Sequence, residues 1–215
     1  MNEHFMHLDA LKNVQSRCLL YPSAGTDWET PLMAFHPWIE SFWFVDTSHK
    51  DSAKLKRLCD SVALIETSAL EGRRINGNPT AVKICRFQCS LGSKQFDVHL
   101  CRGKGYDTFR LAFKDCGKGM SVFFHRGDSL GEGGSAFRWL DRRRLNDVLQ
   151  CLEPGGLIVS DGSLAIPQLA VFNDSSESGE SAFRAAKPFE RFGRAFSCVG
   201  YLNKRNGPTL VWKVN

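Results

Sequence analysis

The chain has 215 residues, of which 42% are hydrophobic and 24% are charged, and these are ordinary proportions for a globular protein. Its net charge of +5 permits nucleic-acid binding but does not indicate it, because dedicated modules carry a denser basic face. The apolar runs are far shorter than the ~20 residues that cross a bilayer, and residues 1–9 lack a signal-peptide pattern. We therefore expect a cytoplasmic protein without a membrane partner, and the oligomeric state stays open.

The eight cysteines are scattered along the chain without a Cys-x-x-Cys pair. Cys85 and Cys89 form the closest pair, and no second cysteine or histidine pair follows at the spacing of a zinc ribbon. Several cysteines, such as Cys18, lie beside apolar residues, where free cysteine packs as a small hydrophobic side chain. The sequence predicts buried free thiols and no metal site.

The first part of the chain predicts two buried strands, each followed by a polar segment and a helix. Residues 17–21 form an apolar run that leads into a turn over 22–27, and a helix is expected over 29–35. A second apolar run covers 42–45, and a lysine-rich helix is expected over 52–60.

The middle of the chain predicts an antiparallel meander. Three β-like runs cover 81–89, 95–101 and 107–113, and short glycine-containing turns separate them. We place this meander within residues 61–115, as a β-rich insertion or as the edge of the main sheet.

The last part of the chain predicts two more buried strands and a hairpin. The strands cover 120–124 and 157–159, and between them a glycine-rich loop leads into a helix that begins near Ser135. Residues 196–202 and 209–214 flank a polar turn, which is typical of a C-terminal hairpin.

These elements together predict one domain over 1–215 with an α/β fold. Four apolar runs each end in a small or acidic polar cluster, and uninterrupted apolar runs suit parallel strands covered on both faces. We therefore expect a Rossmann-like, mostly parallel central sheet with a C-terminal antiparallel hairpin and the inserted antiparallel meander. In such sheets ligands bind beyond the carboxyl ends of the strands, so the polar residues at those ends are candidate site residues.

Three segments resemble class I S-adenosylmethionine-dependent methyltransferases. The segment 18–26 is similar to the first motif of that family, Asp46 stands where the family has an acidic residue after its second strand, and 152–159 resembles the turn before its fifth strand. The resemblance implies a small-molecule or nucleoside ligand, either S-adenosylmethionine or a related nucleoside, with methyl transfer to an acceptor that the sequence does not identify. The cofactor-binding residues that it implies are Pro22, Ser23, Ala24, Gly25, Asp27 and Asp46, with Asp46 holding the ribose hydroxyls.

The candidate catalytic residues are His125, Asp128 and Asp161. A histidine beside a carboxylate can act as a general base near neutral pH, and Asp161 ends the next buried strand. The alternative is structural, with Asp128 capping a turn and His125 ending its strand.

Two departures from the family pattern keep other functions open. Asp27 stands where the family has a second glycine, and 125–128 does not match the motif of nucleobase methylases. The alternatives are a non-catalytic Rossmann-like interaction protein that has lost the cofactor and a nucleotide-processing enzyme that uses His125 and Asp128. An open crevice at the strand ends favours an enzyme, whereas a crevice filled by Trp28 or Phe44 favours a binding role.

Overall fold

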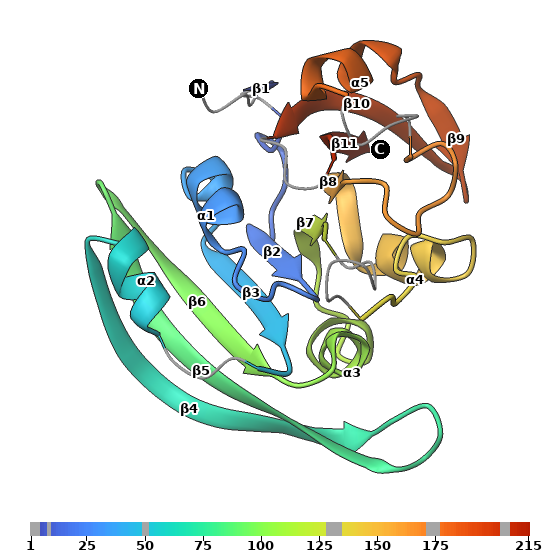
Figure 1. Ribbon diagram of the computed structural model, residues 1–215. Helices are drawn as coiled ribbons and strands as arrows, with labels where there is room; N and C mark the ends of the chain where they lie inside the picture. The colour runs from blue at the N-terminus through green and yellow to red at the C-terminus, as the bar shows by residue number, and fades with distance from the viewer. Residues whose placement is uncertain (1–4, 8–9, 49–51, 128–134, 171–176, 203–206) are drawn as a thin grey trace. The chain divides into compact units, whose positions relative to one another are not determined.

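The computed structural model describes residues 5–7, 10–48, 52–127, 135–170, 177–202 and 207–215 (Figure 1). The chain divides into two compact units. The central unit is Arg17–Gly119, and the terminal unit combines Met1–Ser16 with Met120–Asn215. The single domain expected over 1–215 stays a prediction.

The central unit contains a five-stranded mixed sheet in the order β2-β3-β6-β5-β4. Strands β2, β3 and β6 are parallel to one another, while β5 is antiparallel to both β6 and β4. The strands are β2 (Cys18–Tyr21), β3 (Ser41–Asp46), β4 (Ser61–Arg73), β5 (Pro79–Leu91) and β6 (Lys94–Arg102). The helical segments are α1 (Glu29–Phe35), α2 (Ala53–Leu58), α3 (Gly105–Phe109) and the π-helical η1 (Arg110–Lys114).

The core of the central unit follows from the apolar runs. All four residues of β2 are buried, and so are the four central residues of β3, as uninterrupted apolar runs predict. Helix α1 buries Pro31, Leu32 and Phe35, which lie at helical spacing. The predicted strands at 17–21 and 42–45 and the predicted helices at 29–35 and 52–60 are therefore confirmed to within a few residues.

The meander is present, but its third strand differs from the prediction. Residues 107–113, expected as a strand, lie in α3 and η1, where Phe109, Ala112 and Phe113 are buried at helical spacing. The third strand is instead β4, which precedes the other two and pairs with β5 along its whole length. Strand β4 is exposed at most positions on both faces, so its sequence shows little alternation.

The terminal unit contains strands in the order β1-β10-β11-β8-β7, and β9 pairs with β10. Only β7 and β8 are parallel, and the other pairings described in this unit are antiparallel. The predicted C-terminal hairpin is thus formed by β10 and β11. The elements are β1 (Phe5–Met6), β7 (Met120–His125), α4 (Arg144–Cys151), β8 (Leu152–Ser160), α5 (Gly179–Ala185), β9 (Phe189–Arg191), β10 (Arg194–Leu202) and β11 (Thr209–Val214).

The predicted fold class, an α/β Rossmann-like fold with a mostly parallel sheet, is wrong. The strands are mostly antiparallel, and the protein is 42% strand but only 20% helical. The prediction failed because it considered only the apolar runs and not the strands that pair with them. Those runs do form parallel pairs, but segments 61–102 and 189–214 add antiparallel pairs (β4-β5, β5-β6, β9-β10, β10-β11 and β11-β8), and the helices between strands are short. Among the described residues, no helix is both long and apolar enough to cross a membrane.

Candidate functional site

The turn predicted to bind a cofactor, residues 22–27, is held by hydrogen bonds within the central unit. The Ala24 amide donates to the Val45 carbonyl at 2.9 Å, and the Gly25 amide donates to Asp46 Oδ2 at 3.1 Å. The other carboxylate oxygen, Asp46 Oδ1, accepts the Ser48 amide at 2.7 Å and the Ser48 hydroxyl. Asp46 therefore joins the end of β3 to the turn, and both of its oxygens already accept hydrogen bonds.

The space beside this turn is filled by aromatic side chains. Trp28 stacks on Phe44 with ring centroids 5.9 Å apart and planes 11° apart, and both side chains are buried. The Trp28 indole donates to the Gly25 carbonyl at 3.0 Å, and the Tyr21 hydroxyl donates to Asp27 at 3.2 Å. Pro22 and Ala24 are buried, and Ser23 is half-buried in the same turn. The predicted cofactor residues thus come together, but they pack on one another and on Trp28.

The predicted catalytic residues belong to the terminal unit, apart from Asp128, which lies outside the described residues. His125 ends β7 opposite Ser160 of β8, so His125 and Asp161 lie at the ends of adjacent parallel strands. His125 is fully buried, and Asp161 is 5% exposed. Asp161 accepts the Gly127 amide at 2.7 Å and the Ser163 amide at 2.9 Å. Asp161 therefore holds two turns in place, and His125 offers no exposed ring face to a substrate.

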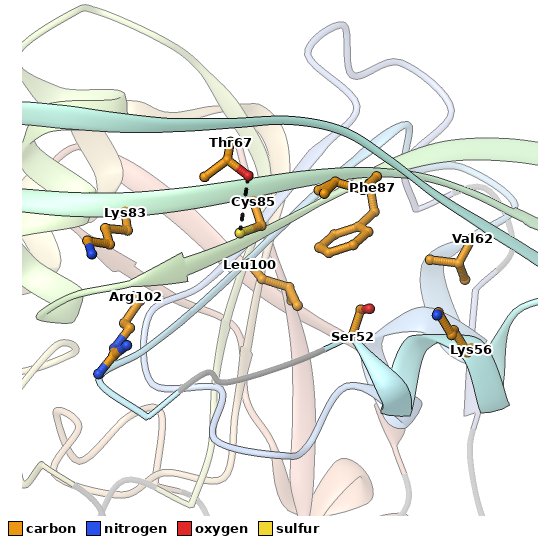
Figure 2. A pocket seen from close by; sticks show the side chains of 10 residues that line it. Ser52, Lys56, Val62, Thr67, Lys83, Cys85, Phe87, Leu100 and Arg102 are labelled. Carbon is orange, nitrogen blue, oxygen red and sulfur yellow. Dashed lines mark hydrogen bonds between the residues drawn. The ribbon is translucent and has the colours of Figure 1, made fainter.

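A groove in the central unit lies outside every predicted site residue (Figure 2). It has a volume of about 510 Å³ and lies between α2 and one face of the β4-β5-β6 meander. Its lining residues are Ser52, Lys56, Val62, Leu64, Thr67, Lys83, Cys85, Phe87, Leu100 and Arg102. We refer to it as the basic groove.

The basic groove has an apolar middle and cationic ends. Phe87 and Leu100 form its centre, with Lys83 and Arg102 toward one end and Lys56 toward the other (Figure 2). On one wall of the groove, Thr67 of β4 is hydrogen-bonded to Cys85 of β5 at 3.8 Å. An apolar middle flanked by cations suits an amphiphilic anion.

The charge in the groove is not neutralised by the protein. None of the lining residues is acidic, and Lys56, Lys83 and Arg102 form no ion pair with any residue that the structure describes. Lys83 and Arg102 also lie directly opposite each other in the β5-β6 register, where like charges destabilise a sheet. A bound anion would remove this repulsion.

Sequence reasoning missed the groove because its residues come from four separate elements. One signal was present, namely Lys83, Cys85 and Phe87 at every second position of β5, which places them on one face of a strand. The partner strand β4 could not be recognised from its own pattern, and the groove exists only because β4 and α2 flank that face.

The opposite face of the meander carries a histidine with a shifted pKa. His99 stacks on Trp43 with ring centroids 4.1 Å apart, and the Lys118 ammonium lies 4.6 Å from the Trp43 ring. Burial, together with the charges of Lys118 and Arg86, lowers the pKa of His99 to about 4. His99 is therefore neutral at neutral pH.

This pKa predicts a loss of stability in mild acid. The unfolded chain binds a proton at His99 as the pH falls through about 6.5, whereas the folded protein resists until about 4, so acid favours unfolding across this window. Urea unfolding should show that the free energy of unfolding falls by about 2 kcal/mol between pH 7.5 and 4.5 because of His99, and the His99→Gln variant should lack this decrease. Equal losses in both proteins would show that His99 is not responsible.

No three metal-ligating side chains of His, Cys, Asp or Glu cluster anywhere in the described part of the chain. Comparison with protein-family models, with curated proteins and with solved structures finds no match. The function must therefore be inferred from the chemistry of the basic groove itself.

Proposed function

We propose that this protein is a binding protein for a small organic anion that carries an apolar or aromatic group. The observation that carries the proposal is the basic groove, in which unpaired Lys83 and Arg102 adjoin the apolar side chains of Phe87 and Leu100. Its volume of about 510 Å³ falls within the range typical of small-molecule sites.

The groove supports binding more than catalysis. Its polar groups are two hydroxyls, a thiol and three cations, and it lacks a carboxylate or histidine that could act as a general base. Cations and apolar surface bind an anion and orient it, but neither removes a proton. This favours a non-catalytic role, which was one of the alternatives raised by the sequence.

The hypothesis of an S-adenosylmethionine site at 22–27 receives less support. Asp46, whose carboxylate would hold the ribose hydroxyls, already accepts hydrogen bonds from Gly25 and Ser48. Trp28 and Phe44 stack beside that turn, and a filled crevice favours a binding role over a methyltransferase. A methyl donor also carries a cationic sulfonium, which the basic groove would repel.

A fluorescence titration with anilinonaphthalene sulfonate, an aromatic anion, tests the proposal. We expect saturable binding, weakened about tenfold by Arg102→Ala because one charged contact is lost. The neutral analogue N-phenylnaphthylamine should bind Arg102→Ala and the unaltered protein alike. Lys94→Ala, which removes an exposed cation outside the groove, is the matched control and should bind the anion normally.

Displacement of the fluorescent anion then distinguishes natural ligands that share this chemistry. Displacement by adenosine monophosphate but not by adenosine would indicate a nucleotide ligand, and displacement by decanoate would indicate a fatty acid. Equal loss of binding in Arg102→Ala and Lys94→Ala would overturn the proposal. Displacement by S-adenosylmethionine alone would also overturn it and would favour the methyl-donor hypothesis.

A further inference from the structure

The strand register fixes the order in which residues line the basic groove. Lys83 of β5 lies opposite Arg102 of β6 at one end of the groove. Two residues further along β5, Cys85 lies opposite Leu100, and Phe87 follows after two more residues. These side chains share one face of the sheet, because alternate residues of a strand point to the same side. The groove therefore changes from cationic to apolar along β5.

The apolar part of the groove ends at a third cation. Leu64 of β4 lies opposite Phe87. Val62 lies opposite Cys89, which is two residues further along β5. Helix α2 contacts β4, and its exposed Lys56 lies at the end of the groove that Val62 lines (Figure 2). The basic groove is thus a cationic pair, an apolar stretch and a second cationic end, in that order.

The two cationic ends are too far apart for one small anionic group. The step from Lys83 to Cys89, which lies opposite Val62, covers six residues of β5. At about 3.3 Å per residue this step is about 20 Å long. The flexible four-carbon stems of Lys83 and Lys56 let their ammonium groups turn inward and shorten this distance somewhat. A ligand that contacts both ends must therefore be long.

We propose that the ligand of the basic groove carries two anionic groups, one at each end of an apolar spacer. One anionic group is bound between Lys83 and Arg102, and the other is bound by Lys56. The spacer covers Phe87 and Leu100. A long-chain dicarboxylate has this chemistry. The inference rests on the proposed function, because it specifies the ligand of the same groove.

Screening by salt separates the two ends electrostatically. An anion between Lys83 and Arg102 lies about 20 Å from the other end of the groove. This is more than twice the Debye length, which is about 8 Å at physiological ionic strength. The attraction between that anion and the exposed Lys56 is therefore weak. Lys56 contributes to binding only when the ligand itself brings an anionic group to it.

The spacing of the cations also selects a chain length. An extended chain spans about 1.2 Å per bond, so dodecanedioate separates its carboxylates by about 13 Å and hexanedioate by about 6 Å. A salt bridge adds about 3 Å at each end. Dodecanedioate is therefore long enough to reach from Lys83 to Lys56, whereas hexanedioate carries the same charge but is too short.

Isothermal titration calorimetry of the full chain with dodecanedioate, dodecanoate and hexanedioate tests the inference. Lys56→Ala should weaken the binding of dodecanedioate about tenfold, because one charged contact is lost. Its affinities for dodecanoate, which lacks the second carboxylate, and for hexanedioate should change by less than about twofold. Arg57→Ala removes the neighbouring exposed cation of α2, which does not line the groove, and should bind all three ligands normally.

The result that overturns the inference differs from the one that overturns the proposed function. If Lys56→Ala binds dodecanedioate normally, or weakens all three ligands equally, the second anionic group does not contact Lys56. If anilinonaphthalene sulfonate binds as proposed but dodecanedioate does not, the ligand with two anionic ends is wrong and the proposed function stands. If neither compound binds, the proposed function itself fails.

Discussion

Replacement of Phe44 with alanine should lower the free energy of unfolding of the central unit by about 3–5 kcal/mol. Phe44 is fully buried in β3, stacks on Trp28 and lies 6.0 Å from the Phe42 ring between centroids. The substitution removes a fully buried aromatic ring, and the cavity left behind adds to the loss of hydrophobic burial. Urea unfolding monitored by tryptophan fluorescence measures the effect.

Two controls separate this effect from general damage. Phe44→Leu keeps most of the buried volume and should lower the free energy of unfolding clearly less than Phe44→Ala does. Ile75→Ala removes a side chain that is 67% exposed and should change stability by no more than about 0.5 kcal/mol. A Phe44→Ala protein as stable as Ile75→Ala would contradict the assignment of Phe44 to the core.

A single charge reversal in the basic groove should stabilise the protein while it impairs binding. Lys83 lies opposite Arg102 in the β5-β6 register, so Lys83→Glu replaces a repulsive pair with an attractive one and should add about 0.2–1 kcal/mol of stability. The same change turns an attraction for the ligand into a repulsion. The affinity for anilinonaphthalene sulfonate should fall about 30- to 100-fold, equivalent to about 2–3 kcal/mol.

The opposite signs of these two effects make the prediction specific, because a variant that merely damages the fold loses both stability and binding. Lys94→Glu changes the net charge equally but lies outside the groove, and it should leave the affinity within about twofold. Both variants are compared by thermal unfolding and by the same titration. Lys83→Glu with unchanged affinity would show that the anion does not bind between α2 and the meander.

The correspondence between sequence and structure is closest where hydrophobic burial is complete. The runs predicted at 17–21, 42–45 and 120–124 were recognised because most of their residues are apolar, and they fall on the buried strands β2, β3 and β7. The helix at 29–35 was recognised from its spacing of apolar residues. Residues 107–113 were misread because short aromatic runs fit a strand as well as a helix.

The site was harder to predict because its residues are distant in the sequence and become neighbours only in the folded structure. Asp46 and Gly25 were predicted to bind a cofactor, and the Asp46 carboxylate instead accepts hydrogen bonds from the Gly25 and Ser48 amides. Lys83 and Arg102 drew no attention in the sequence, and only strand register makes them neighbours.

The sequence by itself determined the buried strands, the first helices, the C-terminal hairpin and the presence of a meander, because local hydrophobic patterns and turn residues specify such elements. Only the tertiary structure decided the antiparallel character of most pairings, the strand β4 and the basic groove. Strand β4 is stabilised by hydrogen bonds to β5, the next strand across the turn at 74–78, rather than by burial of its own side chains, so its sequence lacks the alternation that identifies a strand. A surface built from four elements has no local pattern, so its chemistry emerges only when those elements are assembled.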